Sequence, residues 1–178
     1  TIGIEKLKEK LGGILINPEI KKAGQNVKYD IEVLWNAGLS LEGVSFDTMI
    51  ASYLLNAERS SNSMDAMAKD YLNYECQPIS DLIGKGKSQI TFDKVPAADA
   101  ADYACEDADI TFRLYEYLNK RLNEQPKLKK LFEELEMPLM KVLCKMEIEG
   151  VSIDCSVLDI MSKEIASQIE TLRDSIFA

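Results

Sequence analysis

The longest regular pattern of apolar positions in the chain lies between residues 97 and 122. This segment contains no proline or glycine and consists mostly of good helix formers, so it is predicted to be one long helix. Apolar residues recur there at intervals of three and four, which predicts a single buried stripe. The stripe comprises Ala101, Ala104, Ala108, Phe112, Tyr115, Leu118 and Leu122.

A second row at helical spacing runs beside this stripe and consists of Tyr103, Asp107, Ile110 and Leu114. Asp107 is the one carboxylate in this row, and an unpaired buried carboxylate is costly unless a metal, a cation or several donors compensate it. Two interpretations follow. In the first, Asp107 belongs to a functional site, and the hydroxyl of Tyr103, one helical turn earlier, acts on the ligand that Asp107 binds. In the second, Asp107 lies at the edge of the core, where it pairs with a lysine or caps a neighbouring helix.

Shorter patterns precede the long helix. The predicted helices are 4–16, 29–37, 49–55 and 64–72, and the predicted strands are 22–26 and 44–46. Asp30 would lie in the first turn of a helix just beyond a strand, where an aspartate commonly serves as a cap or as a partner of the helix dipole. Asn26, at the strand end, is typical of a turn. Asp47 follows the second strand and is interpreted as a helix cap.

The remaining segments are a loop, a boundary and two helices. Residues 76–94 are irregular in pattern, and the string GKGK at 84–87 lacks the spacing of a phosphate-binding loop and is interpreted as an exposed basic loop, a kind of surface that attracts phosphate groups. Residues 123–130 are charged and contain a proline, which is typical of a boundary between domains. Helices are predicted at 131–149 and 156–177.

The composition is that of a globular protein and excludes several kinds of site. Hydrophobic residues make up 46% of the 178 residues, which is ample for a core. The chain has no histidine, so a zinc site or a histidine-dependent catalytic triad is not expected. The four cysteines have no close paired spacing and are interpreted as reduced thiols. No apolar run is long enough for a membrane span, and a cytoplasmic location is the default expectation.

The net charge of −9 is opposite to that of most free-standing nucleic-acid binders, which neutralise phosphates with basic surfaces. Two interpretations remain open. Either the chain does not bind nucleic acid by itself, or it offers a small acidic site where metal ions mediate the contact and the basic surfaces lie elsewhere in a larger protein.

Two strings together resemble motifs of a known family. YACEDAD at 103–109 is similar to the third exonuclease motif, and GQNVKYD at 24–30 to the second, of the 3′-5′ proofreading domain of family A DNA polymerases, the bacterial DNA polymerase I type. Similar strings between them, FDTM at 46–49 and GKGKSQITF at 84–92, support the match. EMPL at 136–139 and MEIEGVSID at 146–154 resemble the start of the polymerase domain.

The resemblance implies a fold, a reaction and a set of residues. The fold is α/β, a ribonuclease-H-like 3′-5′ exonuclease domain over residues 1–128, followed by the first helices of a polymerase thumb over residues 129–178. The implied reaction removes nucleotides from single-stranded 3′ ends of DNA, with two Mg²⁺ or Mn²⁺ ions. Asp107 would bind a metal ion directly, and Asp30 would bind it mostly through water. Tyr103 would orient the attacking water, and Asn26 would lie near the end of the bound DNA strand.

One part of the family pattern is missing. The first motif, an Asp-x-Glu on the first strand, has no counterpart before Gly24, because residues 1–23 contain no aspartate. Asp30 and Glu32 have this spacing but cannot replace it, since Asp30 occupies the second motif and neighbouring helical side chains point in different directions. We therefore expect an N-terminally truncated, helix-rich domain with exposed sheet edges and little exonuclease activity of its own.

Two other functions are compatible with the sequence. A free-standing exoribonuclease of the same superfamily would share the aspartates and the tyrosine, but the polymerase-like strings at 136–154 argue against it. An inactive, exonuclease-like scaffold of a polymerase is disfavoured by Asp30, Tyr103 and Asp107, although the missing first motif keeps this alternative open. If the chain belongs to a polymerase, whether as a proofreading domain or as a scaffold, its expected partner is the rest of the polymerase chain.

Overall fold

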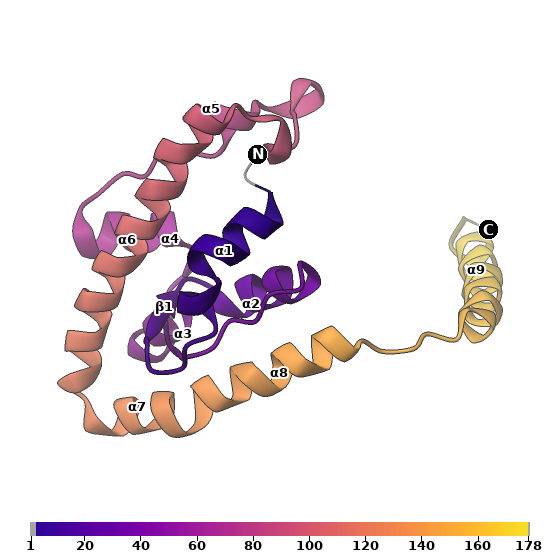
Figure 1. The fold of residues 1–178 in the computed structure, drawn as a ribbon. Coiled ribbons are helices and arrows are strands. Elements are labelled where there is room, and N and C mark those ends of the chain that lie inside the picture. The colour runs from indigo at the N-terminus through magenta and orange to yellow at the C-terminus, as the bar shows by residue number, and fades with distance from the viewer. Residues whose placement is uncertain (1–2, 178) are drawn as a thin grey trace. The chain divides into compact units, whose positions relative to one another are not determined.

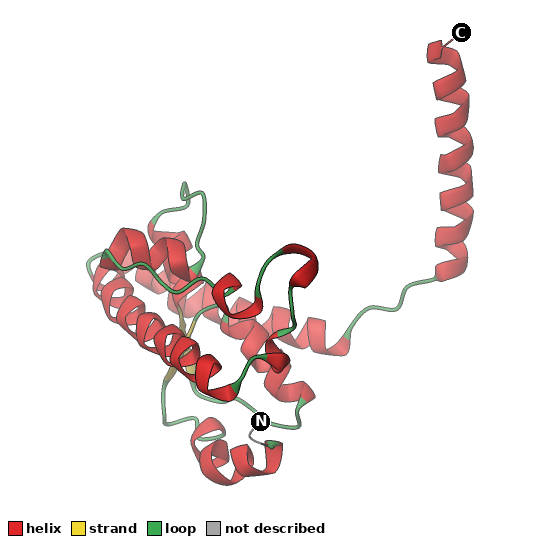
Figure 2. Ribbon diagram, turned by 90° about the horizontal axis from the view of Figure 1, so that it is seen from above, coloured by secondary structure: helices red, strands yellow, loops and turns green. Residues whose placement is uncertain are grey.

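The computed structural model describes residues 3–177, and helices dominate it (Figure 2). Figure 1 labels the elements along the chain, which divides into two compact units between Lys145 and Met146. The second unit contains α9 (Cys155–Phe177) and the end of α8 (Met137–Glu149). The elements of the first unit are α1 (Ile4–Leu15), β1 (Lys22–Gly24), α2 (Val27–Asn36), β2 (Val44–Asp47), α3 (Thr48–Leu55), α4 (Met64–Met67), η1 (Ala68–Leu72), α5 (Ser80–Ile83), η2 (Gly86–Ser88), η3 (Phe92–Lys94), α6 (Ala97–Asn123), α7 (Pro126–Leu131), η4 (Phe132–Glu136) and most of α8.

The two strands form a parallel pair that α2 connects. Lys22 lies opposite Val44 and Gly24 opposite Asp47, with an irregularity after Lys22. The first strand ends at Gly24, two residues earlier than predicted, because Asn26 adopts a left-handed backbone with φ of 54° and cannot continue the strand. Helix α2 then begins at Val27 rather than at residue 29.

The buried face of α6 matches the predicted stripe only in its C-terminal half, where Leu118 and Leu122 are buried as predicted. The three alanines of the stripe are exposed, and Phe112 is 57% exposed. Ile110 and Leu114 of the second row are buried in their place, because larger aliphatic side chains remove more apolar surface from water than alanines do when α6 packs against α3, β1 and η1. The buried residues of α6 are Ile110, Leu114, Leu118 and Leu122.

Phe46 joins the small sheet to the helical core. Its ring lies 4.9 Å from that of Tyr115 on α6, edge to face, and 4.9 Å from that of Phe132 on η4. Such aromatic pairs add to the stabilisation from burial alone. Met67 and Ala51 are fully buried in the same cluster, so strand, helices and the π-helical turn η4 share one core.

Residues 126–149 form one uninterrupted run of helix. The boundary segment predicted at 123–130 is helical from Pro126, which takes the first helical position, where its missing N–H costs nothing. Pro138 has no N–H for the carbonyl of Glu134, and the π-helical turn η4 lies immediately before it, where the α-helical bonding pattern is interrupted. A domain boundary at 128/129 stays a prediction.

Helix α9 is exposed along its whole length. Its first turn is capped by Asp154, whose Oδ1 accepts hydrogen bonds from the backbone N–H groups of Ser156 (2.9 Å) and Val157 (3.3 Å). The same oxygen also accepts a hydrogen bond from the Ser156 hydroxyl (2.6 Å). This hydroxyl contributes most to lowering the pKa of Asp154, and the two backbone N–H groups lower it further. Within residues 3–177, none of the helices combines the length and the apolar character needed to cross a bilayer.

Candidate active site

An open pocket of about 830 Å³ in the first unit brings two distant parts of the sequence together. Asp30 from α2 lines it together with Tyr103 and Asp107 from α6. Asn26 lies at the N-terminus of α2 and is not one of the lining residues, although Gln25 is. The described structure therefore gathers three of the four predicted site residues around one cavity.

The connection from β1 to α2 is a tight turn that only these residue types allow. A Cβ atom on Gly24 would lie 2.9 Å from the Cβ of Val27, which is closer than real Cβ atoms approach, so glycine is required there. Asn26 supplies the left-handed residue, a conformation that asparagine tolerates better than most. The turn starts α2 directly after the strand and places Asp30 in the first helical turn, at the pocket.

Two of the carboxylates that line the pocket, Asp30 and Asp107, are held in their neutral form more readily than ordinary aspartates. Burial raises the pKa of Asp30, and the nearby Asp47 carboxylate adds to the rise. Burial also raises the pKa of Asp107, with further contributions from Asp65 and then Glu106. Because like charges and burial both oppose ionisation here, a cation in the pocket would be favoured.

Asp107 has an unused acceptor. Its Oδ1 atom is buried and has no hydrogen-bond partner. The nearby Tyr103 hydroxyl lowers the Asp107 pKa, but this effect is smaller than those that raise it. A buried carboxylate oxygen without a donor is costly, so this atom is open to interaction with a cation.

Tyr103 packs against an aromatic ring next to the pocket. Its ring lies 6.0 Å from that of Phe92, on the irregular segment before α6. Burial raises the pKa of the Tyr103 phenol, and the charge of Asp107 raises it further. The phenol therefore stays protonated at neutral pH and acts as a hydrogen-bond donor rather than as a base.

Glu106, next to Asp107 in sequence, has a different role that the sequence did not reveal. Its Oε1 accepts a hydrogen bond from the Tyr74 hydroxyl (2.7 Å), and its Oε2 accepts one from the backbone N–H of Gln77 (2.8 Å). Both oxygens are thus used to attach residues 74–77 to α6. Glu106 tethers the chain, and Asp107 faces the pocket.

Two further groups near the pocket were not found from the sequence. Asp65 lines the pocket from the first turn of α4, which Ser63 caps. Burial, followed by the charge of Asp65, raises the pKa of the Cys76 thiol to about 11. Cys76 is therefore a protonated thiol at neutral pH. No spacing in the sequence indicated that the short helix α4 would face α6.

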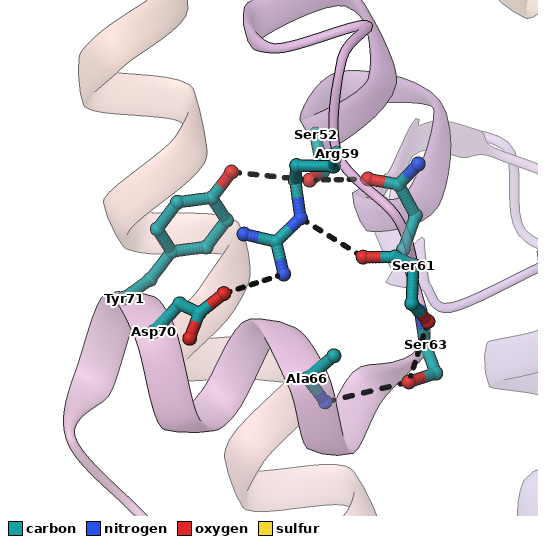
Figure 3. A network of polar contacts seen from close by, with 8 residues as sticks. Ser52, Arg59, Ser61, Ser63, Ala66, Asp70 and Tyr71 are labelled. Atoms are coloured by element: carbon teal, nitrogen blue, oxygen red, sulfur yellow. Dashed lines mark hydrogen bonds and ion pairs between the residues drawn. The ribbon is translucent and has the colours of Figure 1, made fainter.

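A loop beside the pocket is fixed by a nearly buried arginine (Figure 3). The Nε of Arg59 donates a hydrogen bond to the Ser61 carbonyl (2.9 Å). The guanidinium of Arg59 also forms an ion pair with Asp70 (3.0 Å) and lies 4.7 Å from the centre of the Tyr71 ring. The Asn62 carbonyl of this loop accepts a hydrogen bond from Gln25 (3.0 Å), which lines the pocket. Arg59 therefore supports one wall of the cavity.

Replacing Arg59 by methionine is expected to lower the free energy of unfolding by about 1–3 kcal/mol, because it removes charge-assisted bonds from a side chain that is only 9% exposed. Lys69→Met is the matched control, since the Lys69–Glu75 pair lies in solvent and its loss should cost about 0.5 kcal/mol or less. Urea unfolding curves of the two variants measure the difference. Equal losses would show that the Arg59 contacts add nothing to stability.

The pocket fits part of a magnesium or manganese site. These ions prefer oxygen ligands and magnesium keeps several waters, so a few carboxylates on separate elements suffice. Asp30 and Asp107 meet this requirement, and the unpartnered Oδ1 of Asp107 is available to a cation. Within residues 3–177, no three side chains of histidine, cysteine, aspartate or glutamate lie close enough together to hold a metal ion.

Comparison with known proteins gives one family. A sequence model described as 3′-5′ exonuclease matches residues 2–123. DNA polymerase I of Pseudomonas aeruginosa is 39% identical over 161 residues, which cover 89% of this chain and 18% of the relative, and that of Chloroflexus aurantiacus is 37% identical over 173 residues, which cover 94% and 18%. The chain thus spans less than a fifth of the length of these relatives.

A solved structure shares the fold. The POL domain of Pol1 from M. smegmatis, in complex with DNA primer-template and dNTP, superposes with a TM-score of 0.73 at 25% sequence identity. The match covers 93% of this chain and 25% of that chain. It extends the similarity beyond the residues that the family sequence model covers.

Proposed function

Because the chain belongs to the 3′-5′ exonuclease family found in DNA polymerase I, we propose that it is the proofreading part of a DNA polymerase that acts in replication and repair. Its substrate is the single-stranded 3′ end of DNA, from which it releases nucleoside monophosphates. The observation that carries this proposal is the pocket in which Asp30, Tyr103 and Asp107 meet. The bound primer-template of the solved relative supports a DNA substrate.

The proposed mechanism assigns one task to each residue. Two divalent ions, Mg²⁺ or Mn²⁺, would when bound help to activate the attacking water and would stabilise charge at the scissile phosphate. Asp107 and Asp30 would hold these ions, and Asn26 would lie near the bound strand end. The raised pKa of Tyr103 keeps its phenol protonated. Its O–H group can therefore donate a hydrogen bond and would orient the attacking water.

We also propose that carboxylates outside this chain complete the pocket, and that this chain alone has little exonuclease activity. Among the described residues β1 pairs with β2 alone, so its other edge is free for a further strand beside the pocket. The rest of the polymerase chain is the proposed source of that strand. Residues 129–178 are then the start of the polymerase domain.

Release of labelled nucleotide from the 3′ end of single-stranded DNA tests this proposal. The purified 178-residue chain, with Mg²⁺ or Mn²⁺, is expected to release little or none. A longer polypeptide of the same protein that includes an upstream Asp-x-Glu strand is expected to release nucleoside monophosphates, because it holds both halves of the ligand set. The same two preparations on labelled RNA are the substrate control.

Each contrary result points to a different conclusion. Release by the 178-residue chain itself would show that the ligand set is complete without further residues. Failure of the longer polypeptide on DNA would favour the scaffold function. A preference for RNA over DNA would favour an exoribonuclease.

A further inference from the structure

The buried carboxylate of Asp47 binds the N-termini of two helices at once. Its Oδ1 accepts hydrogen bonds from the backbone N–H groups of Met49 (2.8 Å) and Ile50 (3.2 Å) at the start of α3. Its Oδ2 accepts one from the N–H of Val27 (2.8 Å), the first residue of α2. Asp47 is only 1% exposed, so these donors replace water as its partners.

Helix α2 has no cap of its own. Asn26 stands at its N-cap position, but the left-handed backbone of Asn26 leaves its side chain without a capping hydrogen bond. A helix N-terminus normally takes a capping oxygen from the residue that precedes it. In α2 that oxygen comes from another element, the end of β2.

The residue after Asp47 holds the other end of the same turn. The Thr48 hydroxyl, which is fully buried, contacts the Gly24 carbonyl at 3.2 Å and also bonds to the Gln25 side chain. The turn between β1 and α2 is therefore attached at both ends to the junction of β2 and α3. Its position depends on that junction and not only on its own sequence.

We propose that Asp47 is a positioning residue for the Asp30 side of the pocket, because its Oδ2 fixes where α2 begins. Asp30 follows Val27 by about one helical turn, so it moves with the first residue of α2. The relevance of this position to catalysis rests on the function proposed above. The attachment of α2 to Asp47 does not, and it can be tested separately.

A simple α3 cap would not need the second oxygen. One side-chain oxygen is enough to cap a helix, as Ser63 shows by accepting from the Ala66 N–H at the start of α4 (3.4 Å). Serine at position 47 would therefore still cap α3 but would be too short and would lack the second oxygen for Val27. Asp47→Ser separates the two roles.

Amide hydrogen exchange in the ¹⁵N-labelled 178-residue chain measures the attachment. Asp47→Ser is expected to speed the exchange of the Val27 amide by about tenfold or more, since a buried donor loses its acceptor, while the Met49 and Ile50 amides remain protected. Asp47→Asn, which keeps the size of the side chain and one oxygen, should act in the same way. Ser63→Ala is the control and should leave Val27 unchanged. Unaltered Val27 exchange in both Asp47 variants would overturn the proposal.

Paramagnetic line broadening by Mn²⁺ measures the consequence at the pocket. In the wild-type chain the amide signals of Asp30 and Asp107 should broaden at millimolar Mn²⁺, and Asp47→Ser should weaken the effect at Asp30 about threefold or more. Unchanged broadening at Asp30 in the variant would overturn the positioning role. If the wild type shows no broadening at either aspartate, the proposed metal function fails, and the exchange data alone decide whether Asp47 holds α2.

Discussion

Replacing Asp107 by asparagine is expected to lower nucleotide release from single-stranded 3′ ends by about a hundredfold or more in a polymerase that contains this chain. The proposed role of Asp107 is to hold a divalent ion directly, and charge stabilisation by such an ion lowers the activation barrier by several kcal/mol. Asparagine keeps the shape of the side chain but removes its charge. Single-turnover assays with saturating metal measure the loss in the chemical step.

The same substitution should stabilise the metal-free chain at neutral pH. Burial and the charge of Asp65 raise the Asp107 pKa, so keeping this group ionised costs the folded state free energy. That cost is absent below the ordinary pKa of aspartate and develops as the pH rises through the raised pKa. The melting temperatures of wild type and variant should therefore differ at pH 7 and converge in acid, as thermal scans in chelator will show.

Asp109→Asn is the matched control for both measurements. Asp109 lies on the same helix, two residues further on, and its side chain is 66% exposed in a loose pair with Arg113 (3.6 Å). Its replacement should leave nucleotide release within about twofold and stability within about 0.5 kcal/mol. An Asp107 variant that behaves like the Asp109 variant would remove Asp107 from the proposed site.

Replacing Leu114 by alanine is expected to lower the free energy of unfolding by about 3–5 kcal/mol. Its side chain is fully buried where α6 packs against the sheet and the neighbouring helices, so truncation costs both the transfer free energy and a cavity. This is a large fraction of the stability of an ordinary domain. Urea unfolding followed by circular dichroism measures the loss.

Phe112→Ala supplies the comparison, because it removes more atoms from the same helix at a position that is 57% exposed. A cost of about 1 kcal/mol or less is expected there. The pair tests which face of α6 is buried. The stripe predicted from the sequence would make Phe112→Ala the more damaging change, and such a result would restore that prediction.

The sequence predicted the family and most elements. The resemblance of residues 24–30 and 103–109 to exonuclease motifs is confirmed by the family match over residues 2–123 and by the DNA polymerase I relatives. The helix-rich α/β fold is confirmed as well, since long helices carry strong periodic patterns. The roles of Asp30, Tyr103, Asp107 and Asn26 stay predictions, although three of these residues line one pocket.

Errors arose where tertiary contacts override local pattern. Apolar spacing on α6 fits two adjacent rows, and only the packing partners decide that Leu114 rather than Phe112 is buried. The cap expected at Asp47 is confirmed, but its bond to Val27 spans 20 residues and leaves no trace in a local window. Likewise, no local pattern in the sequence indicates that the Arg59 side chain is nearly buried and paired with Asp70.

The contacts of Glu106 and Asp107 depend on the order of these two neighbouring acids, which the overall composition does not record. Exchanging the two residues would keep the length, the net charge and the amino-acid counts of the chain. It would place the shorter acid where Tyr74 and Gln77 are held by the longer one, and the longer acid at the position that lines the pocket. Two sequences with the same composition can therefore differ in whether they keep both the attachment of residues 74–77 and the proposed site.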